Sequence, residues 1–72
     1  MDLKIKLYRR TPGGSLEPLK DCYMLEGISL EMARRQAVDN LEAAKPNASV
    51  VKIFVIGTGE SVFTYPQEAE NA

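Results

Sequence analysis

Hydrophobic and polar residues alternate most regularly at the beginning of the chain. Leu3, Ile5 and Leu7 share one side of residues 2–10, and two lysines fall between them on the other side. This two-residue period is typical of a strand that is buried on one face and exposed on the other. We therefore predict a half-buried first strand over residues 2–10.

Turn-forming residues follow at positions 11–15, where a proline precedes two glycines. A second strand is predicted over residues 16–25. Pro18 has no amide hydrogen, so we expect the beginning of this strand to lie at a sheet edge or in a loop. Cys22 alternates with Met24, and free cysteines are usually buried, so we predict that Cys22 belongs to the core.

A helical period replaces the alternation after Gly27. Ser29 is predicted to cap a helix that runs to about Ala44, because its hydroxyl can accept a hydrogen bond from an amide of the first turn. Pro46 disfavours helical geometry at the residue before it and therefore ends the helix. The positions that recur at helical spacing and should be buried are Leu30, Ala33, Ala37, Leu41 and Ala44.

The segment from Val50 to Tyr65 is apolar on both sides. It is predicted to form a strand, a turn at residues 57–60 and a last strand at residues 61–65. One side of the first of these strands carries Val51, Ile53 and Val55, and the other carries Val50, Lys52, Phe54 and Ile56. A strand packed on one side only should alternate apolar with polar residues. The excess of apolar residues predicts a second contact on the other side.

The order of elements is β-β-α-β-β, which predicts an α+β fold. We expect a four-stranded, mainly antiparallel sheet with one helix packed on one face. Residues 1–66 are predicted to form a single domain, and the polar residues 67–72 a frayed tail. A chain of 72 residues is close to the lower size limit for independent folding, so stabilisation by a partner would not be surprising.

Composition narrows the class of partner and the compartment. The net charge is −1, from nine basic and ten acidic residues, whereas proteins that bind nucleic acid indiscriminately usually have a basic excess. The single cysteine cannot form an intramolecular disulfide, which favours a reducing compartment. The longest apolar run has four residues, and no signal-peptide pattern follows Met1. We expect a cytoplasmic protein with no membrane contact.

The residue types that carry chemistry are scarce. Histidine is absent, and it is the commonest general base and metal ligand. The carboxylates are scattered, with no spacing that would hold a metal ion. Gly57 and Gly59 lack the third glycine of a dinucleotide-binding loop and precede a strand rather than a helix. We expect no enzymatic activity, no cofactor and no metal.

A binding surface is the stronger candidate, because one alanine-rich helix can cover only one face of the sheet. We expect exposed aromatic and apolar side chains on the opposite face to mark an interaction surface. Its partner is a second copy of the chain, a different protein or single-stranded nucleic acid. The predicted outer face carries Lys4, Lys6, Tyr8, Lys52, Phe54 and Ile56, joined by Tyr23 and by Phe63 or Val62.

Three arginines are further candidates for partner contacts. Arg9 and Arg10 lie beside the glycine turn, where a surface loop could contact a partner or a phosphate. Arg34 falls inside the apolar stripe of the predicted helix. Either its aliphatic stem lies on apolar surface while its charge reaches water, or its guanidinium contacts an anion.

The layout resembles that of several very small phage or mobile-element proteins, including anti-CRISPR inhibitors. The similarity lies in a strand at residues 4–9, the segment Gly27-Ile28-Ser29-Leu30 leading into a helix with Ala33-Arg34-Arg35, and the hairpin from Val50 to Tyr65. Inhibitors of this kind act without catalysis, by occupying a nucleic-acid or subunit surface of an effector complex. The resemblance implies a protein-interaction module that inhibits a host complex. The alternative from the residues is a small nucleic-acid-binding domain that uses Lys4, Lys6, Tyr8, Lys52 and Phe54.

Overall fold

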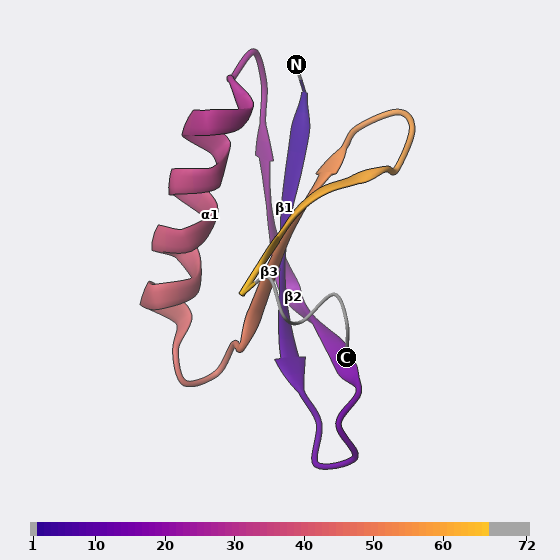
Figure 1. Cartoon of the computed structure of the whole chain (residues 1–72), viewed down its shortest axis with the longest axis vertical. Coiled ribbons are helices and arrows are strands. Elements are labelled where there is room, and N and C mark those ends of the chain that lie inside the picture. Colours follow the sequence, from indigo (N-terminus) through magenta and orange to yellow (C-terminus); the bar gives the residue numbers. More distant parts are fainter. Residues whose placement is uncertain (1, 67–72) are drawn as a thin grey trace.

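The computed structural model describes residues 2–66, which form one antiparallel sheet and one helix lying along a single face of it (Figure 1). The predicted α+β fold is confirmed. The predicted tail at residues 67–72 lies outside the described residues. The elements are β1 (Leu3–Arg10), β2 (Leu16–Leu25), α1 (Leu30–Ala44), β3 (Val50–Val55) and β4 (Ser61–Tyr65).

The strand order is β2-β1-β3-β4, so the strand with the most regular alternation lies inside the sheet. Both β2 and β3 are antiparallel to β1 and therefore run parallel to each other on either side of it. Parallel strands cannot be joined by a tight turn and need a crossover connection. The helix α1 provides this crossover, and it packs against β3 and β1.

The core lies between α1 and the sheet. Leu41 is the largest of the buried residues of the helix, and it is fully buried. Burial of a side chain of this size stabilises a fold by about 1.5–3 kcal/mol. The buried members of the core are Leu3, Ile5, Leu7, Ala33, Ala37, Leu41, Ala48, Val51 and Ile53.

The ends of α1 are determined by the residues predicted for them. The Ser29 hydroxyl accepts a hydrogen bond from the Met32 amide at 3.2 Å, and Ser29 itself is extended, as an N-cap residue should be. At the other end Lys45 is also extended, which is the geometry that a following proline favours. The serine cap and the proline after Lys45 thus determine both ends of the helix through local sequence alone.

Two predictions about β2 are wrong. Ile5 lies opposite Tyr23, and Lys6 lies opposite Cys22. Because directly opposed residues point to the same side of a sheet, Tyr23 belongs to the helix side and Cys22 to the outer side. The Cys22 side chain is exposed rather than part of the core.

The reason is the register in which the first two strands pair. Arg10 pairs with Leu16 and Lys6 with Cys22, so even-numbered residues of β2 lie opposite even-numbered residues of β1, on the outer side. Between Lys6 and Tyr8, β1 advances by two residues while β2 advances by four, and a shift by an even number of residues leaves the faces unchanged. The face that each residue of β2 occupies is therefore set by its partner in β1 and not by its own pattern.

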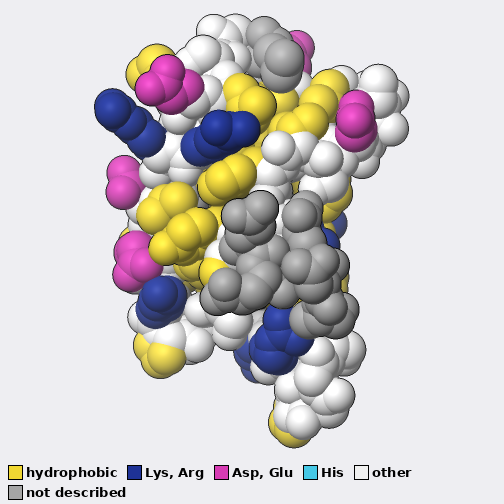
Figure 2. Space-filling model, viewed as in Figure 1, with side chains coloured by type: hydrophobic (Ala, Val, Ile, Leu, Met, Phe, Trp, Pro, Cys, Tyr) yellow, Lys and Arg dark blue, Asp and Glu magenta, His cyan; other side chains and the backbone are white. Residues whose placement is uncertain are grey.

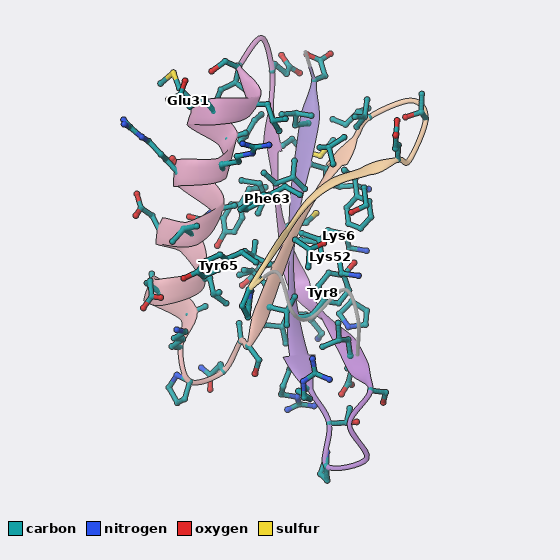
Figure 3. The ribbon with its side chains drawn as sticks, in the orientation of Figure 1. Lys6, Tyr8, Glu31, Lys52, Phe63 and Tyr65 are labelled. Atoms are coloured by element: carbon teal, nitrogen blue, oxygen red, sulfur yellow. The ribbon has the colours of Figure 1, made fainter. Side chains whose placement is uncertain are left out.

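The predicted placement of Phe63 or Val62 on the outer face is also wrong. Phe63 lies opposite Ile53, on the helix side, and the pairing of β3 with β4 is irregular at the next position. Val62 and Phe63 both pack against the core. Figure 3 shows the Phe63 side chain between the sheet and α1.

Candidate binding face

Side chains on the face of the sheet away from α1 form rows across the strands. Lys6 and Lys52 are directly opposed on β1 and β3, and Lys4 is directly opposed to Phe54. Figure 3 shows Lys6, Tyr8 and Lys52 on the side away from the helix. Strand β2 adds Cys22 opposite Lys6 and Met24 opposite Lys4. We call these seven residues the outer face: Lys4, Lys6, Tyr8, Cys22, Met24, Lys52 and Phe54.

At one end of the outer face, Tyr8 lies close to two lysine ammonium groups. The Nζ atom of Lys52 lies 5.5 Å from the centre of the Tyr8 ring and that of Lys6 lies 5.9 Å from it. These distances fall within the range of cation–π attraction. Burial raises the pKa of the Tyr8 phenol above its ordinary value, even though nearby cations act in the opposite direction. The phenol is therefore neutral at physiological pH.

A shallow hollow of about 500 Å³ lies at the other end of the outer face. One wall is the turn between β3 and β4, in which Gly57 and Gly59 have φ angles of 104° and 76°, a region that glycine adopts without strain. Lysine side chains and apolar side chains meet in this space, and none of its lining residues within 2–66 is acidic. The lining residues are Lys4, Lys6, Met24, Phe54, Val55, Ile56, Gly57, Thr58 and Gly59.

The predicted residue Ile56 lies just beyond the end of β3 and lines the hollow with 39% of its surface exposed. Met24, which was not among the predicted contacts, is 59% exposed and lines the same hollow. No signal in the sequence could have placed Met24 there, because its face follows from the register in which β2 pairs with β1. Phe54 is partly buried beside both residues.

Tyr23 is partly exposed on the opposite side of the sheet from the hollow. It lines a second depression, of about 340 Å³, between β2 and the end of α1, together with Leu19, Asp21 and Asn40. Tyr23 therefore cannot contact the same partner surface as Phe54 through one face of the sheet. The structure separates it from the other predicted contacts.

Arg9 and Arg10 are engaged within the chain. The guanidinium of Arg9 forms an ion pair with Glu17 at 2.8 Å across β1 and β2. Arg10 donates a hydrogen bond to the Gly14 carbonyl at 2.6 Å and so closes the turn between the two strands. Both arginines remain exposed, but they lie at the end of the sheet away from the hollow.

Arg34 lies on the helix side of the molecule, over the ring of Phe63, with 5.6 Å between the guanidinium carbon and the ring centre. Figure 2 shows hydrophobic side chains gathered along the seam between α1 and β4. Arg34 thus covers part of an aromatic side chain that the helix leaves exposed. This favours the packing interpretation over an anion contact.

Two other features are absent from residues 2–66. No group of three metal-ligating side chains occurs among these residues. None of their helical segments has the length and apolar character needed to cross a membrane. Comparison of the chain with protein-family models, with curated proteins and with solved structures gave no match.

Proposed function

We propose that this chain is a non-enzymatic protein-interaction module that docks its outer face onto an acidic surface of another protein. The observation that carries the proposal is the composition of that face. Three lysines, Lys4, Lys6 and Lys52, lie beside partly exposed apolar side chains, and none of the seven residues that define the outer face is acidic. Among the described residues, the outer face therefore carries three positive charges, whereas the chain as a whole has a net charge of −1.

A different protein fits this face better than a second copy of the chain. In a dimer with two-fold symmetry the same patch meets itself. Three lysines of one copy would then approach three lysines of the other, and juxtaposed like charges are costly at an interface. An acidic partner instead converts the same lysines into favourable contacts and lets Phe54 become buried.

The module would act by occupying its partner's surface. This is the mode of the small phage or mobile-element inhibitors that the layout resembles, so a host effector complex, CRISPR-like or other, is the partner that we propose. The exposed, free thiol of Cys22 supports a cytoplasmic location as part of this proposal, because free thiols persist in reducing compartments.

Single-stranded nucleic acid is the second candidate, supported by aromatic side chains interleaved with lysines at Tyr8 and Phe54. Bases bind such surfaces by stacking on aromatic rings. Here Lys6 and Lys52 both lie within 6 Å of the Tyr8 ring centre. A base would have to displace these ammonium groups before it could stack, so we rank this candidate below a protein partner.

The test is affinity capture from cells of the source organism with three immobilised forms of the chain. We expect the wild type to retain a defined protein, and the double variant Lys6→Gln with Lys52→Gln to lose most of it. Arg35→Gln, which removes one positive charge from the exposed surface of α1, is the control and should retain it. Equal capture by all forms would refute the proposal.

Salt dependence separates the two candidates. Binding to nucleic acid weakens steeply as salt rises, because each neutralised phosphate releases a counterion. A protein interface with an apolar centre should lose much less affinity over the same range. Retention of nucleic acid instead of protein, with a steep salt dependence, would favour the second candidate.

A further inference from the structure

The hollow differs from the rest of the outer face in that it is concave. Phe54, Met24 and Ile56 contribute apolar side chains to its lining, and Lys4 and Lys6 contribute ammonium groups. A flat acidic surface would pair with lysines but would leave this space empty. A projecting apolar side chain would fit the concave shape of the hollow, and carboxylates next to it would pair with the two lysines.

We infer that the hollow binds an extended segment of the partner. In this segment two acidic residues and one apolar residue occupy alternate positions, so that all three side chains point to the same side. This deepens the proposed function and rests on it, because the segment is part of the protein partner. The glycine turn between β3 and β4, which lines the hollow, would lie against the apolar side chain, while the two lysines pair with the carboxylates.

The spacing of the lysines supports an extended segment. Lys4 and Lys6 are two residues apart on one strand, which separates them by about 6.8 Å along its length. Alternate residues of an extended peptide have the same separation and point to the same side. Two acidic residues separated by one residue therefore match the lysine pair, and an apolar residue two positions further reaches the hollow beyond Lys4.

The direction in which the segment runs is not set by this spacing, so the probes have both orders. They are two blocked pentapeptides, Glu-Ser-Glu-Ser-Phe and Phe-Ser-Glu-Ser-Glu. Amide chemical shifts of the isotope-labelled full chain report where each probe binds. We expect one of the two to shift the amides of Lys4, Met24, Phe54 and the turn at residues 57–59, with saturation.

Matched probes and variants isolate charge and shape. Replacing both glutamates of the probe by glutamine should weaken binding roughly two- to thirtyfold, the effect of two exposed ion pairs. Replacing its phenylalanine by alanine should also weaken binding. Lys4→Gln should weaken binding of the acidic probe, whereas Lys52→Gln should change it by less than about twofold, because Lys52 is on the outer face but does not line the hollow. Met24→Ser tests the apolar side at an exposed position and should leave the fold intact.

Each outcome has a distinct meaning. Shifts confined to the hollow, with the expected loss for Lys4→Gln, support the inference. If the partner is captured in a Lys6- and Lys52-dependent manner but neither peptide shifts the hollow, the inference fails and the proposed function stands. If oligothymidylate shifts these amides at lower concentration than either peptide, the inference fails in favour of nucleic acid. If capture is unaffected and no probe binds, both proposals fail.

Discussion

Lys6 and Lys52 lie directly opposite each other on neighbouring strands, with both ammonium groups within 6 Å of the centre of the Tyr8 ring. Like charges at opposed positions of a sheet are destabilising. The negative face of an aromatic ring attracts cations, by about 0.5–1 kcal/mol at exposed sites. Tyr8 therefore offsets the repulsion that arises because the outer face brings two lysines together.

Removal of the ring should expose this repulsion. We expect Tyr8→Leu to lower the free energy of unfolding by about 1 kcal/mol, and Tyr8→Phe to lower it by less, because phenylalanine keeps the ring. In the Tyr8→Leu background, Lys52→Gln should restore part of the loss. Urea unfolding of the wild type, Tyr8→Leu, Lys52→Gln and the double variant measures the coupling between the two positions. Additive effects of the two substitutions would show that the ring and the lysine do not interact.

The raised pKa of Tyr8 predicts a pH dependence of stability in the alkaline range. Burial favours the neutral phenol in the folded state, so the folded chain holds this proton more tightly than the unfolded chain. The contribution is fully present below the ordinary phenol pKa of 10.0 and is lost as the pH rises through the raised value.

The measurement is the difference in free energy of unfolding between the wild type and Tyr8→Phe. The subtraction removes the pH dependence that both forms share. We expect a constant difference at neutral pH and a decline in the relative stability of the wild type above pH 10. A difference that stays flat to higher pH would place the Tyr8 phenol in water.

Adjacent residues of β3 should respond oppositely to the same substitution. Ile53 is fully buried against α1, so Ile53→Asp would place an unpaired charge in the core and should unfold the chain. Phe54 is partly exposed on the outer face, so Phe54→Asp should keep the native circular dichroism spectrum and lose the captured partner. If Phe54→Asp unfolds the chain as well, Phe54 is a core residue and the proposed binding face is wrong.

Arg34 should matter for stability and not for partner binding. Its guanidinium lies over Phe63 on the helix side, so Arg34→Ala should lower the free energy of unfolding by about 0.5–1 kcal/mol. Arg34→Lys should lose less, because a lysine can still lie over the ring. Thermal unfolding measures the stability of both variants. If Arg34→Ala loses the captured partner at a temperature where this variant is folded, Arg34 is a partner contact after all.

The fold was predictable because its determinants are local or strictly periodic. The alternation around Ile5 defines the first strand, the Ser29 hydroxyl begins the helix, and Pro46 ends it. Each of these effects acts within a few residues of the chain, so the sequence alone contains it. The crossover between β2 and β3 then leaves few arrangements of the sheet.

The binding face was only partly predictable. Lys4, Lys6, Tyr8, Lys52 and Phe54 lie on strands whose pairing is regular, so parity alone places them on one face. Strand β2 is different, because its faces are set by the register in which it pairs with β1, and its own sequence has no clear alternation. The contacts that depend on it, Met24, Cys22 and Tyr23, could not be assigned without the structure.

The outer-face position of Cys22 gives a direct test of this register. An exposed thiol should react with a soluble disulfide reagent at nearly the same rate in the native and the urea-unfolded chain. A core thiol would react only through unfolding, which slows the reaction by orders of magnitude in a stable domain.

Because Cys22 lies opposite Lys6, a bulky maleimide at this thiol should also block capture of the partner. Cys22→Ser, treated in the same way, is the control and should retain the partner. Slow reaction of the native thiol would contradict the register, whereas fast reaction without loss of capture would move the partner surface away from β2.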